Sequence, residues 1–411
     1  MLNISHERRL TLFIPAACGL TFFIGLEAGG FQFILLKVAL VFSLNELMMG
    51  IMAASQAASI TLAALIFGQL ADKIGKKSTL LIFMPIFSAG CFLTAAASSA
   101  YFFMGGVFLI GIGLSICESI GSSALSDSFP GRESRFLNIM QCSFSLGAVA
   151  SPLLFKQLVM GWGFSWRLVF LVPGCGYAFL YPLMLLSECG NPISPKEFTS
   201  LKPDQNSQTG SILTILRTPF FLALLFSMMI YVSMEAGIAF FIDTFMTLEY
   251  SPILGAYGIS LFWFAMAVSR FFFAWVRMSK HAMVSLGFAG GAIFLLLFLF
   301  IKNQWLVLCI YTALGFLMGP VWPMIMGIGM SAYQEKSGMV GGILYASGGA
   351  GGMISPILIG FVAGHSGGKL LLSGGLSPGS GFYRGFILLS LFSFSALLVM
   401  QIWGKTRKER E

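Results

Sequence analysis

Long apolar runs alternate with short polar breaks along almost the whole chain. Splitting the runs at charged or Gly/Pro-rich breaks gives twelve segments, most of them near the roughly 20 residues that cross a bilayer as a helix. They cover residues 11–36, 45–70, 78–98, 101–126, 137–159, 166–187, 219–246, 253–276, 282–301, 304–329, 337–362 and 382–403. The pattern predicts an all-α, polytopic membrane protein with twelve transmembrane helices.

One long polar stretch interrupts the pattern between the sixth and seventh segments. It reads ECGNPISPKEFTSLKPDQNSQTGS and is rich in Pro, Ser and Asn, a composition typical of a linker. We therefore expect an N-terminal six-helix bundle at 1–187, a linker at 188–217 and a C-terminal six-helix bundle at 218–411.

The composition agrees with a membrane protein and excludes several other classes. Of the 411 residues, 57% are hydrophobic and only 10% are charged, which is far too little charge for a soluble globular domain. The seven cysteines form no CxxC pair, and no histidines stand at metal-ligand spacing, so neither a disulfide framework nor a metal site is expected. The basic N-terminus precedes a long apolar run that we interpret as an uncleaved first helix.

Basic residues are distributed unevenly over the polar breaks. If the N-terminus is cytoplasmic, eighteen Lys and Arg residues fall on the inside and six on the outside. The positive-inside rule then predicts that both termini and the linker are cytoplasmic, with the membrane being the cell membrane. The net charge of +8 is explained by an anionic lipid surface, so nucleic acid is not expected as a partner.

The two halves of the chain repeat each other. EAG at 27–29 recurs at 235–237, and SFSLGAVASPLL at 143–154 aligns with SGGAGGMISPIL at 347–358. Both pairs run in the same membrane direction, so we expect a parallel repeat of two bundles with a site between them near the bilayer midplane.

The stretch GQLADKIGKK at 68–77 matches the G-x-L-A-D-[RK]-x-G-[RK]-[RK] loop of the major facilitator superfamily at every specified position. The chain therefore resembles this superfamily, which implies secondary transport by alternating access. The glycines permit a tight turn, and Asp72 is expected to face the positive N-terminal end of the eleventh helix. We assign a gate group consisting of Gly68, Asp72, Gly75, Lys76, Lys77 and Arg270.

Several other phrases are similar to the fucose, galactose and glucose proton-symporter branch of that superfamily. They are LNIMQCSFSLGA at 137–148, IYVSMEAGIAFF at 230–241 and LFWFAMAVSRF at 261–271. The resemblance implies that Glu118 lies where the branch carries a proton-coupling glutamate. It also implies that Gln141 is a site residue. The first-helix acid of the branch would align with Gly30, about one turn beyond Glu27.

Three carboxyl groups, Glu27, Glu118 and Glu235, lie well inside predicted spans. A charged carboxylate at mid-membrane costs at least ~2.5 kcal/mol, so it must be paired, protonated or hydrated. No Lys or Arg is expected at comparable depth. Because burial favours the neutral form and hydration favours the charged form, we interpret the three as proton-coupling groups. The alternative is that they only form hydrogen bonds between neighbouring helices.

Amide and aromatic residues inside the spans are candidates to bind a solute. Packing is the alternative for each of them, and 23 methionines would also suit apolar ligands. The assigned substrate-binding residues are Gln141, Gln32, Tyr231, Trp263, Trp322 and Tyr345, and Gln56 is a further candidate.

The leading hypothesis is proton-coupled symport of a small polar organic solute, with a sugar as the first candidate. The alternative is proton-coupled efflux of drugs or apolar metabolites, and a receptor of the same fold is a third possibility. No enzyme activity, cofactor or metal is expected. The expected partners are a small-molecule substrate, protons and membrane lipid, and the expected state is a monomer. The sequence specifies neither the solute nor the direction of net transport.

Overall fold

The described residues fold into helices, most of which are joined by short loops. The computed structural model describes residues 6–44, 46–67, 70–129, 132–189, 215–250, 252–276, 278–298, 300–333, 336–364 and 380–403, and every regular element among them is helical. The first half contains α1 (His6–Val41), α2 (Glu46–Phe67), α3 (Leu70–Ile74), α4 (Lys76–Ala95), α5 (Ala100–Ser128), α6 (Glu133–Phe155), the π-helical η1 (Lys156–Gly161) and α7 (Leu168–Leu186). The second half contains α10 (Pro219–Glu249), α11 (Pro252–Phe273), α12 (Lys280–Leu297), α13 (Gln304–Met318), α14 (Val321–Ala332), α15 (Ser337–Gly364) and α16 (Ser380–Trp403).

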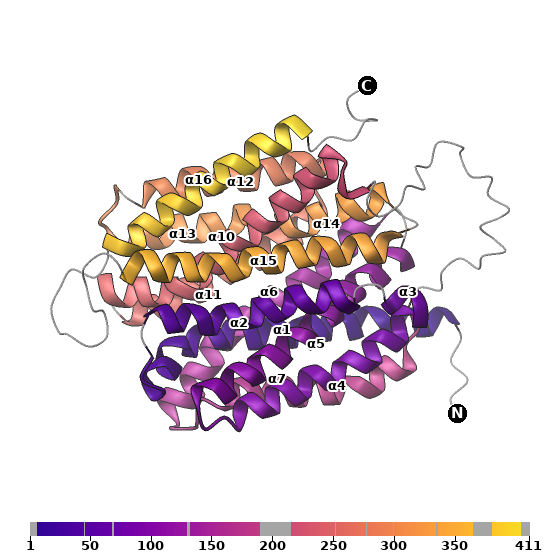
Figure 1. The fold of residues 1–411 in the computed structure, drawn as a ribbon, viewed down its shortest axis with the longest axis horizontal. Helices are drawn as coiled ribbons and strands as arrows, with labels where there is room; N and C mark the ends of the chain where they lie inside the picture. Colours follow the sequence, from indigo (N-terminus) through magenta and orange to yellow (C-terminus); the bar gives the residue numbers. More distant parts are fainter. Residues whose placement is uncertain are drawn as a thin grey trace.

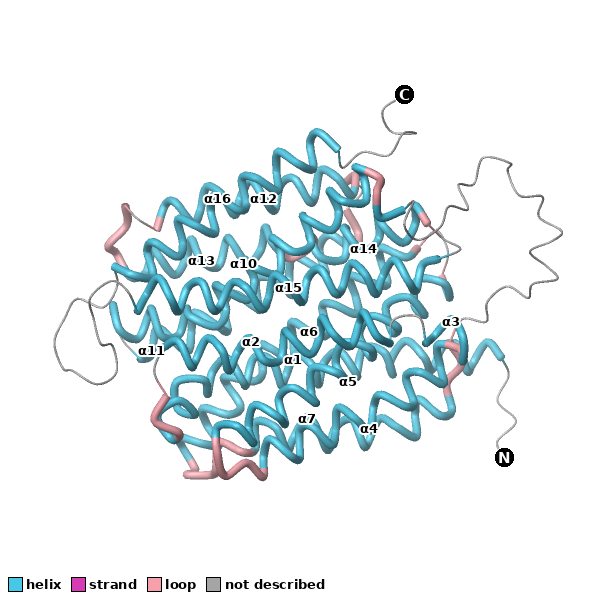
Figure 2. Tube along the Cα trace, in the orientation of Figure 1, coloured by secondary structure: helices cyan, strands magenta, loops and turns pink. Residues whose placement is uncertain are grey.

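The two halves form two bundles that lie side by side (Figures 1 and 2). We call α1 to α7 the N-bundle and α10 to α16 the C-bundle. The start of α1 and the end of α16 lie at the same end of the molecule, which we call the termini end (Figure 1). Most of the predicted linker, residues 190–214, lies outside the described residues.

The number of membrane crossings agrees with the predicted fold class. Eleven described segments are long and apolar enough to span a bilayer, and a shorter apolar helix covers Tyr257–Phe273. One span, Gln304–Ala332, consists of α13 and α14, which meet at Gly319 and Pro320. The prolyl ring removes a backbone N–H donor, which interrupts the helix at this point. The result is the predicted twelve-helix architecture.

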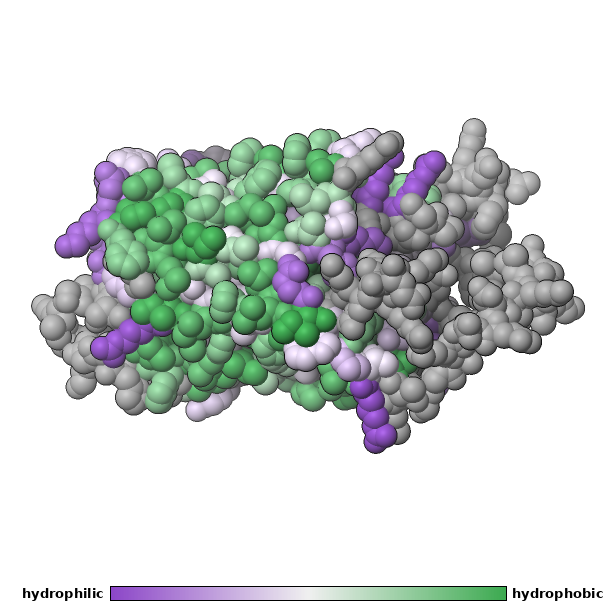
Figure 3. Space-filling model, turned by 90° about the horizontal axis from the view of Figure 1, so that it is seen from above, coloured by the Kyte–Doolittle hydropathy of each residue, from purple (hydrophilic) through white to green (hydrophobic). Residues whose placement is uncertain are grey.

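The outer surface also fits a bilayer. Apolar residues cover the middle of the face seen in Figure 3, and hydrophilic residues lie toward both ends. Large apolar side chains are exposed on the outside of the molecule. Phe179 and Phe300, for example, are 82% and 80% exposed. Exposed apolar area of this extent is stable only against lipid.

The predicted internal repeat has a structural counterpart at two glycines. Gly147 of α6 packs against the Phe22 carbonyl of α1, and Gly351 of α15 packs against the Met229 carbonyl of α10. In both places a Cβ atom would overlap the backbone of the neighbouring helix. Small residues at corresponding positions therefore allow corresponding helix pairs to approach closely.

Candidate functional site

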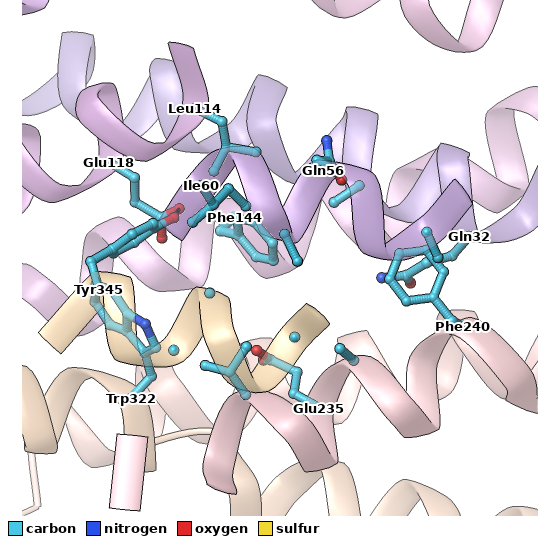
Figure 4. A pocket seen from close by; sticks show the side chains of 18 of the residues that line it. Gln32, Gln56, Ile60, Leu114, Glu118, Phe144, Glu235, Phe240, Trp322 and Tyr345 are labelled. Carbon is cyan, nitrogen blue, oxygen red and sulfur yellow. Dashed lines mark hydrogen bonds between the residues drawn. The ribbon is translucent and has the colours of Figure 1, made fainter. Parts of the chain in front are cut away.

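A cavity lies between the two bundles. It offers about 150 Å³ in which the centre of a water molecule fits, several times the roughly 10–15 Å³ that one water requires. Helices of both halves supply its wall (Figure 4). The polar and aromatic residues of the wall are Gln32, Gln56, Glu118, Gln141, Phe144, Glu235, Phe240, Trp263, Arg270, Trp322 and Tyr345.

Glu118 of α5 joins the two bundles at this wall. Its Oε1 accepts a hydrogen bond from Nε2 of Gln141 at 2.7 Å, and its Oε2 accepts one from the Tyr345 hydroxyl of α15 at 2.5 Å. The side chain is only 5% exposed. The sequence predicted all three residues as site residues, and the structure brings them into direct contact.

Glu235 of α10 forms a second cluster, and here one sequence expectation was wrong. Its Oε1 accepts from the Tyr231 hydroxyl at 2.8 Å and lies 3.5 Å from Nη2 of Arg270. A basic residue therefore does lie at the depth of this glutamate. The pairing supplies a countercharge that we did not expect for a carboxylate within a span.

Arg270 of α11, which we assigned to the gate group, is buried in the cavity wall. Its Nε donates to the Gly319 carbonyl at 2.9 Å. Its Nη1 donates across the interface to the Gln141 carbonyl at 3.1 Å and to the Ser145 hydroxyl at 2.6 Å. Its burial was not expected, because the residue lies near the end of its predicted span, while neighbouring helices cover it in three dimensions.

Glu27 of α1 lies behind the wall and does not line the cavity. Its Oε2 accepts a hydrogen bond from Nε2 of Gln56 at 3.0 Å, and Gln56 faces the cavity. No described residue bonds the buried Oε1. The two EAG phrases thus occupy comparable places in α1 and α10 but present their carboxyl groups to different surroundings.

Trp263 of α11 and Gln32 of α1 connect the bundles on the other side of the cavity. The indole Nε1 donates to Oε1 of Gln32 at 3.1 Å. The Phe144 ring meets the indole edge to face at a centroid distance of 5.3 Å, and Phe240 packs on Phe31 at 5.7 Å. Figure 4 shows Gln32 and Phe240 at one side of the cavity and Glu118 and Tyr345 at the other.

Five of the six predicted substrate-binding residues line the cavity, and Tyr231 does not. Tyr231 is buried and donates a hydrogen bond to Glu235 of the same helix. Sequence reasoning missed Phe144, Phe240 and Ser145. With 42 phenylalanines in the chain, no signal distinguishes two that face a cavity from those that face lipid or the core.

The loop at the end of α2 carries the rest of the gate group. Gly75 adopts a φ of 87°, which explains the glycine before α4. Lys76 forms an ion pair with Asp127 and donates to Ser123 at 2.7 Å, so it bonds within the N-bundle. Lys77 donates to the Ser187 carbonyl at 2.6 Å. Gly68 and the side chain of Asp72 lie outside what the structure describes.

Comparison with known proteins adds a family and a fold. The model of the Major Facilitator Superfamily matches residues 17–356. The crystal structure of the fucose:proton symporter FucP of E. coli superposes with a TM-score of 0.71, covering 96% of this chain and 98% of that one at 15% identity. At this identity the likeness concerns the fold alone.

Curated relatives match over shorter stretches. Azole resistance protein 1 of Saccharomyces cerevisiae is 34% identical over 124 residues, which are 29% of this chain and 19% of that protein. The chloramphenicol resistance protein CraA of Acinetobacter baumannii is 30% identical over 106 residues, 25% of this chain and 26% of that protein. The chain thus matches about a quarter or less of the length of either protein.

Proposed function

Because the chain belongs to the major facilitator superfamily, we propose that it is a proton-coupled symporter of a small polar organic solute, with a sugar as the first candidate. The chain is a multi-pass membrane protein of a transporter family. The single observation that supports proton coupling is the position of Glu118, a buried carboxyl group at the cavity wall with one partner in each bundle.

Protonation of Glu118 would change the contact between the bundles. As a carboxylate it accepts bonds from Gln141 and from Tyr345. Once protonated, one oxygen becomes a hydroxyl that donates a bond of its own and accepts more weakly, so the bond from one of the two donors would be weakened. Proton binding at this residue would therefore weaken a contact that alternating access has to break.

The cavity wall suits a polar solute. The amide groups of Gln32, Gln56 and Gln141 offer both donors and acceptors, and the rings of Trp263 and Trp322 offer faces for the apolar side of a sugar. Gly349 of α15 also belongs to the wall and allows α15 to pack closely on Thr61 of α2. Few polar groups on an otherwise apolar wall are typical of small-molecule sites.

The two bundles would rock about this site. The contacts from Tyr345 to Glu118 and from Arg270 to Gln141 join residues nearer the termini end of their helices. The contact from Trp263 to Gln32 lies on the other side of the cavity. Opening toward either end requires the contacts on that side to separate. Cytoplasmic termini remain a prediction of the charge pattern, and contact with lipid remains a prediction of the apolar surface. A monomeric state is also a prediction.

Proton-coupled efflux is the second candidate. It is favoured by the names of two partial relatives, which are resistance proteins for azoles and for chloramphenicol. In that case the proton and the solute would move in opposite directions through the same cavity. Both functions use Glu118, so the direction of coupling distinguishes them.

Binding to the purified protein tests the proposed site. A panel of neutral sugars, nicotinamide and chloramphenicol is screened by thermal unfolding, since a ligand at 100 times its Kd stabilises by about 2.7 kcal/mol. We expect stabilisation by at least one polar solute, and its loss in Trp263→Ala. The Trp305→Ala variant, at an exposed indole outside the wall, is the control. Stabilisation by chloramphenicol alone would favour efflux.

A further inference from the structure

The only basic side chain among the described residues of the cavity wall is Arg270, and its hydrogen-bonding capacity is already used. A guanidinium carries five N–H donors. Five protein acceptors take them: the carbonyls of Gly319 and Gln141, the hydroxyls of Ser145 and Tyr231, and Oε1 of Glu235. An anionic group of a solute would have to displace one of these acceptors to reach the cation.

The carboxyl oxygens of the wall are not all hydrogen-bonded by described residues. Glu118 has a donor on each oxygen, but both bonds to Glu235 reach Oε1, and no described residue donates to its Oε2. The Glu235 side chain is 17% exposed, compared with 2% for Arg270. Figure 4 shows its carboxyl group directed toward the space between the bundles. One acidic acceptor thus remains open to the cavity.

The charge balance of the wall points the same way. Glu118 and Glu235 stand against the single cation of Arg270, so the wall is neutral with one glutamate protonated and carries one negative charge with none. A like charge inside a low-dielectric cleft is repelled, whereas an opposite charge is concentrated there.

From these observations we infer that the cavity selects neutral or cationic solutes and rejects anions, with Oε2 of Glu235 as the acceptor for a donor group of the solute. The inference rests on the proposed function, because it specifies the solute of the same cavity. It separates a sugar, an amide or an amine from a sugar acid or another carboxylate of equal size.

The test measures the electrostatic potential of the cavity and does not require the natural solute. Ala236 lines the cavity next to Glu235 and is replaced in Ala236→Cys. The full-length variant is treated with a cationic trimethylammonium-ethyl, an anionic sulfonato-ethyl and a neutral methyl methanethiosulfonate. Modification at position 236 is followed by peptide mass spectrometry, so the natural cysteines do not interfere. Each rate is divided by the rate with a small thiol in solution.

We expect the cationic reagent to react at least about tenfold faster than the anionic one on this scale. Adding Glu235→Gln should reduce the ratio, and adding Arg270→Gln should increase it. Glu249→Gln is the matched control, since it lies 14 positions further along the same helix, about 21 Å away, and should leave the ratio unchanged.

The outcomes separate the two claims. Equal rates, or a faster anionic reagent, would overturn the charge selectivity while leaving a solute cavity in place. No modification by any of the three reagents would show that the cavity is closed to solutes, which contradicts the proposed function and this inference with it.

Discussion

The hydroxyl of Tyr345 donates a hydrogen bond to Oε2 of Glu118, although the two residues are 227 positions apart and belong to different bundles. Both lie in the part of their helices nearer the termini end, since Glu118 is ten residues before the end of α5 and Tyr345 is eight after the start of α15. The bond is therefore placed to hold the bundles together between the cavity and that end.

Removing this bond should favour opening at the termini end. We expect Tyr345→Phe to shift the equilibrium between the states closed and open at the termini end by about 1–2 kcal/mol. This is a five- to thirtyfold change in their population ratio. Spin labels at Lys73→Cys and Met278→Cys, on exposed residues of the two bundles, should show a larger share of long distances.

A second tyrosine serves as the control for that measurement. Tyr383→Phe removes a hydroxyl that bonds Tyr250 within the C-bundle. Its distance distribution should match that of the unsubstituted protein. If Tyr345→Phe also leaves the distribution unchanged, the bond does not hold the bundles together.

Gly147 should be intolerant of even one added methyl group. A Cβ atom there would overlap the Phe22 carbonyl of α1, and overpacking of this kind costs about 1–3 kcal/mol. Gly105 of α5 has nothing within 4 Å of its Cβ position, so Gly105→Ala should be neutral or stabilising by up to about 1 kcal/mol. Thermal unfolding of both variants in detergent checks this, and equal midpoints would contradict the close approach of α1 and α6.

The charge pattern predicts that the segment between the bundles faces the cytoplasm. Gln205→Cys should therefore resist a membrane-impermeant maleimide in intact cells and react after permeabilisation. Asn303→Cys, at the exposed start of α13 on the end opposite the termini, should react in both conditions. Labelling of position 205 in intact cells would reverse the predicted topology.

The overall architecture could be predicted from the sequence because hydropathy acts locally. Each apolar run predicts its own helix, and the repeated small residues predict helix pairs that approach closely in both bundles. The span 304–329 was predicted as one segment, whereas the structure divides it at Gly319 and Pro320. The five-residue α3 was also missed because it lies in a polar loop.

The site could be predicted only as a set of residue types. Amides, acids and tryptophans inside spans are far rarer than the 42 phenylalanines, and most of the residues that we assigned do line the cavity. Their partners could not be predicted, because the bond from Trp263 to Gln32 joins residues 231 positions apart and depends on how the bundles meet. The burial of Arg270 could not be predicted for the same reason, since it depends on how neighbouring helices pack around the residue.

Internal pH in proteoliposomes tests the central claim most directly. Vesicles that enclose a pH-sensitive dye receive the neutral sugars, nicotinamide and chloramphenicol on the outside, while entry of each solute is followed with a radiolabel. Coupling makes the pH change independent of protein orientation, because both directions of transport obey the same stoichiometry.

Symport predicts internal acidification on addition of at least one polar solute. Glu118→Gln, which cannot exchange a proton, should abolish the acidification while retaining exchange of labelled for unlabelled solute. The control variant Glu249→Gln should behave like the unsubstituted protein. Internal alkalinisation during solute entry, or solute entry without any change in pH, would contradict proton symport.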